Sequence, residues 1–449
     1  MLTKDAINAM IKMNIAYNMN GGVSVENQVE IWIPYGTGRI PVHVAEENLA
    51  AVVEAPISAA AEGDQEELVR RAMEAPIGSR RLSELAQGKR KVLIVTSDHT
   101  RSVPSRITLP ILTQEILAGQ ADAKITVLIA TGLHRAMTQA ELIDKFSREM
   151  VERFPFVSHN AFDSAAMEFV CVLPSGARFE VNRLALEADL VVTEGFIEPH
   201  FFAGFSGGRK SILPGISSRT SVVENHSFRA LDHENARSGV LKGNPINEDM
   251  VAAARSVGVA FTLNVALNAD KKIIGAFAGD LEEAHEAGCR FVRELSGAKR
   301  VKGDIVVTSN GGYPLDQNLY QCPKSISTAA EYAEEGGVLI LAASCMDGIG
   351  GTYFEKLMTM GKPEQILEYL RGLPPRETIP EQWCAQVFAR IMLCHPVILV
   401  SEHLPPGAAE RVNMRQADDL DQALEMAYQL TGRQAKVVVI PDGVSVIAT

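Results

Sequence analysis

The sequence of 449 residues is poor in cysteine: it has six, and no two of them form a Cys-x-x-Cys pair. In a long chain whose start carries no export signal, this scatter predicts neither a disulfide framework nor a zinc knuckle. We expect reduced and mostly buried thiols. The six are Cys171, Cys289, Cys322, Cys345, Cys384 and Cys394.

Long apolar runs are also missing. No uninterrupted apolar stretch approaches the ~20 residues that a membrane-spanning helix needs. The first residues, MLTKDAINAMIKMN, put acidic and amide side chains where a signal peptide has its apolar core. These absences predict a cytoplasmic protein with no membrane partner.

Positive charge is in deficit, because the formal net charge is −12 and no run of lysine and arginine makes a stripe for a phosphate backbone. Nucleic acid is therefore not an expected partner. A small anionic substrate would have to be held by local cations, because the overall field repels it.

Two nucleotide-binding signatures are absent. No predicted strand is followed by Gly-x-Gly-x-x-Gly with an acidic residue ~20 positions later, which argues against a nicotinamide-dependent dehydrogenase. The P-loop pattern fails because Arg209 separates Gly208 from Lys210, which argues against a P-loop ATPase. No sequence repeat indicates a solenoid.

What the sequence does have is apolar content in an alternating order. Hydrophobic residues make up 46% of the chain, more than one core usually holds, so we predict an α/β fold of two domains. Short apolar runs, alternating with helical segments at 105–118 and 138–151, predict mainly parallel sheets. The predicted strands lie at residues 29–33, 91–95, 125–129, 304–308, 337–342, 396–400 and 436–440.

A charged helix near residues 280–295 separates the two series of strands, so we place the domain boundary near Ala298. The prediction is an N-terminal extension at 1–26, an N-terminal domain at 27–297 and a C-terminal domain at 298–449. The active site is expected in the cleft between the two domains. The sequence leaves open whether the last strand returns to the first domain, and it leaves the oligomeric state open.

Polar loops follow the strands of the first domain, where open α/β sheets bind ligands. Asp98-His99-Thr100-Arg101 comes just after the strand at 91–95 and before a helix with Pro104 at an early position. This loop suits an anion. A capped helix start with a surface arginine is the alternative interpretation.

The next loop, Gly132-Leu133-His134-Arg135, follows the strand at 125–129. Gly132 permits a tight turn that aims His134 outward, and Thr138 and Glu141 are spaced as a capping box for the next helix. By itself, a loop histidine is equally consistent with an ordinary solvated side chain.

The most informative segment runs from Glu198 to Gly215. Its glycine-rich backbone can cradle a phosphate through N–H groups, and its apolar neighbours would make the Lys210 amine a usable nucleophile. His226 follows on a helix predicted to begin near Ser218. Alone, it is equally consistent with a helix histidine bonded to a neighbour.

The last segment, 310–324, follows the first strand of the second domain. Gln321 and Lys324 are three apart, so they would share a helix face, where an amide and an ammonium make a plausible grip on a carboxylate. A solvated helix start is the alternative.

Taken together, these segments resemble the nickel-dependent lactate racemase family, in whose order and approximate spacing they occur over most of the chain. The resemblance implies an isomerase, a racemase or epimerase of a 2-hydroxy acid, that acts by reversible hydride transfer through a 2-keto acid. It also implies a cofactor, the nickel-pincer nucleotide. This is pyridinium-3,5-bisthiocarboxylic acid mononucleotide holding Ni(II), covalently tethered to Lys210.

The resemblance assigns roles residue by residue. His226 would be the protein ligand to nickel, which imidazole suits, and His134 and His200 would be the two bases, one for each enantiomer. Cofactor-biosynthesis enzymes are expected partners. The resemblance gives cofactor binding to Asp98, His99, Thr100 and Arg101, and substrate binding to Tyr320, Gln321, Lys324 and Trp383.

The chain departs from the family pattern at Ser102, where a proline is expected, and in its N-terminal extension. These departures leave room for a substrate other than lactate. The alternatives are an epimerase of a larger acid, such as a sugar acid or a malate-like acid, and a non-catalytic cofactor-binding homologue.

Overall fold

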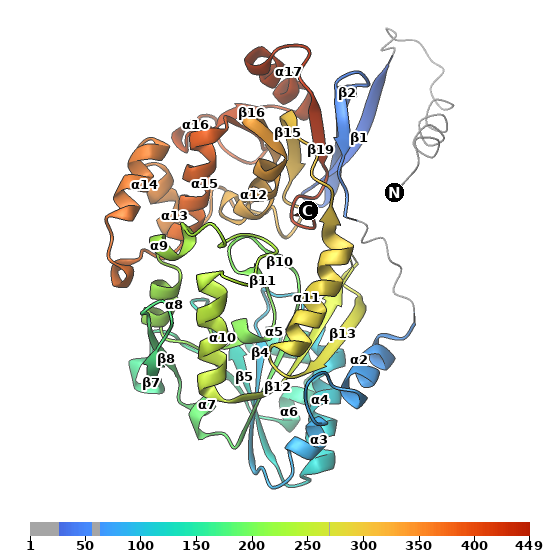
Figure 1. Ribbon diagram of the computed structural model, residues 1–449, viewed down its shortest axis with the longest axis vertical. Coiled ribbons are helices and arrows are strands. Elements are labelled where there is room, and N and C mark those ends of the chain that lie inside the picture. Colours follow the sequence, from blue (N-terminus) through green and yellow to red (C-terminus); the bar gives the residue numbers. More distant parts are fainter. Residues whose placement is uncertain (1–26, 56–62, 269) are drawn as a thin grey trace. The chain divides into compact units, whose positions relative to one another are not determined.

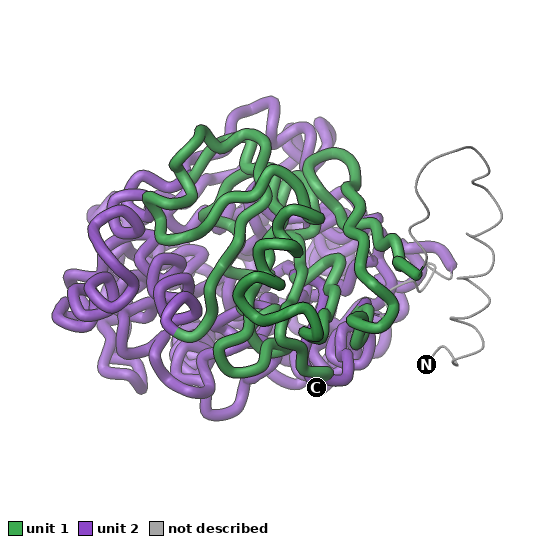
Figure 2. Tube along the Cα trace, turned by 90° about the horizontal axis from the view of Figure 1, so that it is seen from above, with its two compact units in different colours: residues 1–53, 301–349, 394–443 green, residues 54–300, 350–393, 444–449 purple. Residues whose placement is uncertain are grey.

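The computed structural model describes residues 27–55, 63–268 and 270–449. The predicted N-terminal extension lies outside the described residues. The chain forms two compact units that are discontinuous in sequence (Figure 2). Unit 1 contains the described residues up to 53 together with 301–349 and 394–443, and unit 2 contains those of 54–300 together with 350–393 and 444–449.

The units differ from the linear division predicted near Ala298. Residues 28–45 form a hairpin that packs on the sheet of unit 1, whereas the helices of 350–393 belong to unit 2. The last strand, β20 (Ile447–Ala448), pairs in parallel with β14 (Gly297–Ala298) within unit 2. Tertiary packing therefore assembles each unit from separate stretches of chain.

Unit 2 is built on a six-stranded sheet in the order β13-β12-β9-β4-β5-β6, in which only β12 and β13 are antiparallel neighbours. The predicted strands at 91–95 and 125–129 are confirmed as β4 and β5, and their apolar interiors are buried because both faces of the sheet are covered. The strands are β4 (Lys91–Ser97), β5 (Lys124–Ala130), β6 (Phe156–Ser158), β9 (Leu190–Phe196), β12 (Val259–Leu267) and β13 (Ile273–Gly279).

Two apolar clusters cover the faces of this sheet (Figure 1). One is formed with α2 to α6, the other with α10 and a small hairpin of β7 (Met167–Val172) and β8 (Arg178–Asn182). The helices are α2 (Gln65–Glu74), α3 (Leu82–Leu85), α4 (Ser105–Gly119), α5 (Gln139–Phe146), α6 (Arg148–Arg153), α7 (Leu184–Glu187), α8 (Arg219–Asn225), α9 (Phe228–Leu231), α10 (Pro245–Val257), α11 (Glu283–Ser296), α13 (Thr352–Met358), α14 (Pro363–Arg371) and α15 (Gln382–Cys394).

The predicted helix at 138–151 is wrong in one respect, because it is two helices. The predicted capping box is present at its start, where Thr138 and Glu141 bond reciprocally. Helix α5 then ends at Ser147, whose φ of 76° is incompatible with a continuing helix, and the Ser147 hydroxyl caps α6.

Unit 1 has a six-stranded parallel sheet in the order β18-β17-β16-β15-β19-β3. Its predicted strands at 304–308, 337–342, 396–400 and 436–440 are confirmed. The strands are β3 (Leu49–Val52), β15 (Gly303–Ser309), β16 (Ala333–Ala342), β17 (Val397–Val400), β18 (Arg415–Ala417) and β19 (Val437–Ile440).

One face of this sheet carries α17 (Leu420–Thr431) and the antiparallel hairpin of β1 (Gln28–Tyr35) and β2 (Gly38–Ala45). Helix α12 (Pro323–Tyr332) packs against β15 and β16, and α16 (Ala408–Arg411) lies beside β18. Residues of β1 alternate between exposed and buried, as the sequence pattern predicts for a strand with one covered face.

The six cysteines are free, and four of them are buried, as expected. Within the described ranges, no helix is both long enough and apolar enough to span a bilayer.

Candidate active site

Three loops at the carboxyl edge of the unit 2 sheet carry the predicted chemistry. Residues 98–101 follow β4, residues 132–135 follow β5, and residues 198–210 follow β9. From β4 the chain continues to β5 and β6 on one side of the sheet, whereas β9 and β12 lie on the other. Such a reversal of strand order is where open α/β sheets bind ligands.

Asp98 and His134 form a pair across two of these loops. The His134 Nδ1 lies 2.7 Å from Oδ2 of Asp98, which is 1% exposed, and Oδ1 accepts from the Thr100 amide and hydroxyl. Burial alone would raise the pKa of Asp98, but the bonds from His134 and Thr100 and the charge of Arg101 lower it to about 2. The ionised carboxylate thus accepts the Nδ1–H hydrogen bond, which leaves Nε2 as the nitrogen with the lone pair when the ring is neutral.

The rest of the first two loops is more exposed. Arg135 makes a double ion pair with Glu141 and lies 3.4 Å from the His99 ring nitrogen. Arg101 is exposed, and its carbonyl accepts from the Lys145 ammonium. Arg101 is therefore a candidate for an anion, while His99 sits beside an already paired cation.

His200 and Lys210 meet in the third loop. The Lys210 Nζ lies 3.2 Å from Nε2 of His200 and 5.5 Å from the centre of the Phe202 ring. His200 is on β10 (Pro199–His200), which pairs with β11 (Gly204–Phe205), and its Nδ1 accepts from the Ala203 amide. The tight hairpin thus brings the predicted base beside the predicted tether.

The glycines before Lys210 are required by close packing. Gly207 has a φ of 114°, and a Cβ on Gly208 would lie 2.3 Å from the Thr262 hydroxyl. The Gly208 amide donates to Asn264 of β12. The glycine segment therefore lies in close contact with the sheet. Lys210 lies within the short 3-10 turn that begins there (Gly208–Ser211).

Arg209, which the sequence analysis treated only as the residue that breaks a P-loop pattern, is a buried hub. Its guanidinium donates to the carbonyls of Ala203, Phe205 and Ser206, and also contacts Asn247 and His285. Burial lowers its pKa to about 10, so it remains a cation at neutral pH, and each of these partners is neutral. It ties together the loop between His200 and Lys210.

His226 ends α8, which begins near Ser218 as predicted, and the Ser218 hydroxyl caps the start of this helix. The ring is buried, packs edge-on against Phe202 at 5.0 Å and Trp383 at 5.2 Å, and its Nδ1 has no hydrogen-bond partner among the residues that the structure describes. Burial first, and then the charge of Lys210, lower the pKa of His226 to about 3. The ring is therefore neutral at physiological pH, the form that binds metals.

An unpartnered, neutral, buried imidazole nitrogen fits a nickel ligand, because such an atom is otherwise costly to bury. In the described parts of the chain, no three His, Cys, Asp or Glu side chains are grouped so that they could hold a metal. A metal ion on His226 would thus take further donors from a bound group. The residues around His226 and Lys210 fit such a group.

Trp383 reaches His226 because the helices of 350–393 are bonded to α8 and α9. Arg376 pairs with the buried Glu224 of α8 at 2.9 Å, and Gln386 donates to the Phe228 carbonyl. Sequence reasoning placed Trp383 in the substrate pocket. The structure places its ring against the predicted metal ligand.

Glu194 is a further residue that sequence reasoning missed. It lies on β9, is fully buried, and accepts hydroxyl donors from Thr96, Ser105 and Thr108, which holds the start of α4 near the loop at 98–101. Its signal in the sequence is a carboxylate inside an otherwise apolar run, LVVTEGF.

The structure brings the unit 2 residues together in two groups: Asp98 with His134, and Lys210 with His200, Phe202, His226 and Trp383. The Gly132 amide donates to the Gly215 carbonyl and so links the loops that carry them. Tyr320 and Gln321 lie on a 3-10 turn (Leu319–Gln321) of unit 1 that continues through Cys322 into α12, which carries Lys324. The shared face of Gln321 and Lys324 stays a prediction.

Comparisons with known proteins identify the family of the chain. The lactate racemase N-terminal domain matches residues 35–239, and the lactate racemase C-terminal domain matches residues 298–448. A lactate racemase of Thermoanaerobacterium thermosaccharolyticum is 46% identical over 419 residues, which cover 93% of this chain and 98% of that protein. The chain belongs to the lactate racemase family.

Other relatives support this placement. A lactate racemase of Lactiplantibacillus plantarum is 45% identical over 424 residues, which cover 93% of this chain and 99% of that protein. The structure of the lactate racemase apoprotein from T. thermosaccharolyticum superposes with a TM-score of 0.91 at 45% identity, covering 94% of this chain and all of that one. A Thermotoga maritima protein, with a TM-score of 0.60 and 22% identity over 81% of this chain and 95% of that one, shares the fold. The expected family and α/β fold class are confirmed.

Proposed function

We propose that this lactate racemase family member is an isomerase that racemises a 2-hydroxy acid, with lactate as the first substrate to test, and that it uses the nickel-pincer nucleotide. The observation that carries the proposal is the pair of imidazoles, His134 and His200, on separate loops at the carboxyl edge of the unit 2 sheet, with His200 beside Lys210. Each enantiomer presents its hydroxyl on a different side, so a racemase of this kind needs two bases.

Four residues or segments of unit 2 would bind the cofactor. His226 would donate Nδ1 to nickel, Lys210 would carry the covalent link, and Arg101 would bind the phosphate, for which a guanidinium is well suited. His99 and Thr100 would line the nucleotide. Bound there, the cofactor would accept a hydride from carbon 2 of the substrate and return it.

His134 is held ready as a base. Because Asp98 accepts the hydrogen bond from Nδ1–H and so fixes that tautomer, Nε2 is the atom that would accept the hydroxyl proton of one enantiomer. In this proposal Asp98 is a positioning residue for His134, which adds to the cofactor role given to it by resemblance. A carboxylate in this place also stabilises the imidazolium that forms.

His200, whose Nε2 faces Lys210, would serve the other enantiomer. The planar 2-keto acid formed from the substrate would turn in the site and collect the proton and hydride on its other face. Tyr320, Gln321 and Lys324 would bind the substrate carboxylate or keto oxygen. Trp383 and Phe202 would keep water from the region of His226.

The test is racemisation in D₂O by protein co-expressed with the cofactor-making enzymes. L-lactate should become a mixture of both enantiomers, and ¹H NMR should show that the hydrogen on carbon 2 is retained. Protein made without the cofactor-making enzymes is the control and should be inactive. Exchange of that hydrogen with deuterium during racemisation would indicate proton abstraction and contradict the mechanism. If the loaded protein inverts none of lactate, malate and a sugar acid, the proposed function is wrong.

A further inference from the structure

The β1–β2 hairpin of unit 1 packs through one face on the unit 1 sheet. Its inward side chains, Ile31, Ile33, Val42 and Val44, pack with apolar residues of β15 and β16 in one buried cluster. This packing places the hairpin across the face of the sheet. It thereby fixes the position of the turn at Tyr35 and Gly36.

The turn is hydrogen-bonded to loops that follow two different strands. The Gly36 amide donates to Oδ2 of Asp316 at 2.7 Å, and the Gly36 carbonyl accepts from the Tyr313 amide at 2.8 Å, both in the loop after β15. The Tyr35 hydroxyl accepts from the Glu402 amide at 2.8 Å, in the loop after β17. The hairpin thus reaches the edge of the unit 1 sheet where ligand-binding loops are found.

Asp316 joins the hairpin to a third loop. It is fully buried, and its Oδ2 also accepts from the Ser344 amide, in the loop after β16, at 3.1 Å. Its other oxygen, Oδ1, has no hydrogen-bond partner among the described residues. A buried carboxylate is retained only where its hydrogen bonds matter, because it is otherwise costly.

Main-chain hydrogen bonds connect Asp316 with the proposed substrate residues. The Asp316 carbonyl accepts from Cys345, the Gln317 carbonyl from Asp347, and the Tyr320 amide donates to the Ile349 carbonyl, at 2.7 to 3.0 Å. The loops after β15 and β16 are therefore joined by main-chain hydrogen bonds from Asp316 to Tyr320. Gln321 is the next residue, and Lys324 lies in the first turn of α12.

We infer that Asp316, with the hairpin turn at Tyr35 and Gly36, is a positioning device for the loop that presents Tyr320, Gln321 and Lys324. The inference rests on the proposed function only for the claim that these three residues bind the substrate. Asp316 acts through its oxygen acceptor, since it bonds two main-chain amides and no cation in the described structure.

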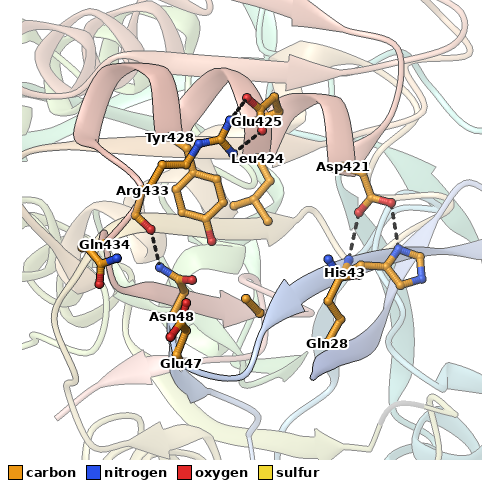
Figure 3. A pocket seen from close by; sticks show the side chains of 11 residues that line it. Gln28, His43, Glu47, Asn48, Asp421, Leu424, Glu425, Tyr428, Arg433 and Gln434 are labelled. Carbon is orange, nitrogen blue, oxygen red and sulfur yellow. Dashed lines mark hydrogen bonds and ion pairs between the residues drawn. The ribbon is translucent and has the colours of Figure 1, made fainter. Parts of the chain in front are cut away.

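This chemistry defines the variants. Asp316→Asn keeps an oxygen that can accept from Gly36 and Ser344, whereas Asp316→Ala removes it. The matched control is His43→Gln. His43 joins the same hairpin to α17 through Asp421 at 2.7 Å and lines a hollow of about 610 Å³ whose lining includes no residue of the three loops (Figure 3).

The first measurement is hydrogen exchange by mass spectrometry, which does not need a functional enzyme. In Asp316→Ala, peptides covering 310–324 and 343–350 should exchange about tenfold faster, the size expected when buried amides lose their acceptor. Peptides covering 198–212 of unit 2 should not change. Asp316→Asn and His43→Gln should leave the two loops as they are. Equal exchange in Asp316→Ala and the unmodified protein would overturn the inference.

The second measurement is kinetic. Asp316→Ala should raise KM for the hydroxy acid about tenfold while kcat and cofactor occupancy by intact mass stay close to normal, as expected for lost ground-state positioning. Asp316→Asn should restore KM. If Asp316→Asn is as impaired as Asp316→Ala, the charge and not the acceptor matters, and the inference is wrong.

Two further outcomes are separable. If Asp316→Ala does not fold, Tyr35→Phe takes its place: it removes only the acceptor of the Glu402 amide, and peptides covering 401–407 should exchange faster. No change in that variant contradicts the bracing. If no hydroxy acid is racemised at all, the proposed function fails, whereas the exchange results still decide the role of Asp316.

Discussion

The two units hold their candidate functional residues in different ways. In unit 2, side chains hold side chains: Asp98 orients His134, Lys210 contacts His200, and Phe202 and Trp383 flank His226. In unit 1, Tyr320, Gln321 and Lys324 follow a loop that main-chain amide–carbonyl hydrogen bonds hold to the loop after β16. The contacts of unit 2 therefore set the orientation and the protonation of individual side chains. The contacts of unit 1 set the position of a loop.

Each unit nevertheless relies on one fully buried charge. Arg209 of unit 2 donates to three loop carbonyls, and Asp316 of unit 1 accepts from two loop amides. The signs are opposite and the task is the same, because each side chain holds the main chain of a loop through several buried hydrogen bonds. The units differ in the residues on the loop that is held. In unit 2 these include His200 and Lys210, and in unit 1 they include Tyr320 and Gln321.

Lys210 should give the largest effect. Intact-mass analysis of protein co-expressed with the cofactor-making enzymes should show an adduct that is lost completely in Lys210→Ala, together with racemisation, because the covalent link is lost. Lys272→Ala, at an exposed lysine of the same unit, is the control and should keep the adduct. An adduct that persists and maps to another lysine would disprove the assignment.

The two histidines come next. His134→Ala and His200→Ala should each lower complete racemisation by about 10²- to 10⁴-fold, the usual effect of removing a general base. In single turnovers followed by cofactor absorbance, each variant should still react with one enantiomer, and the two should prefer opposite ones. The same preference in both variants, or an unmodified rate in either, would rule out the two-base arrangement.

Asp98→Asn should reduce the rate with one enantiomer by about ten- to a hundredfold, as outer partners of functional histidines typically do. With the Asn oxygen held by the Thr100 amide and hydroxyl, its NH₂ group would face Nδ1 and donate to it, so the other tautomer of His134 is favoured. Single turnovers with each enantiomer measure this. Because Asp98 bonds His134 and not His200, an equal loss for both enantiomers would contradict its assignment as the positioning residue for His134.

Arg101 and Lys324 distinguish the units directly. Arg101→Ala should lower cofactor occupancy, measured by intact mass and nickel content. Lys324→Ala should leave occupancy close to normal and raise KM about tenfold, because one charged hydrogen bond to substrate is lost. Loss of cofactor from both variants would remove the proposed division of labour between the units.

The smallest effect concerns pH and the anchor of the hairpin in unit 1. The hydrogen bond to Asp421, assisted by Glu30, raises the pKa of His43 above its ordinary value of 6.5. The stabilisation is thus fully present below about pH 6.5 and is lost as the pH rises through the folded pKa. His43→Gln should lower the urea midpoint at pH 6 and match the unmodified protein at pH 9. A deficit that is equal at both values would show that the charge of His43 is not involved.

Much of the fold could be predicted because its signals are local. Apolar runs marked β4, β5 and the strands of unit 1, and Thr138 with Glu141 marked the start of α5. The break at Ser147 could not be predicted, because 138–151 is helical in pattern and a serine gives no local signal for a positive φ. The place of the 28–45 hairpin in unit 1 was likewise invisible, since alternation tells which face is covered and not by what.

For the candidate site, the sequence by itself determined the residue types, their order and their place at the ends of strands, which sufficed to find His134, His200, Lys210 and His226. Their roles stay predictions. Only the tertiary structure decided which groups meet: Asp98 with His134, Trp383 with His226, and Asp316 with Gly36, 280 residues apart. Such pairings depend on how distant segments pack, and a buried charge such as Arg209 or Asp316 shows its purpose only when its partners are in view.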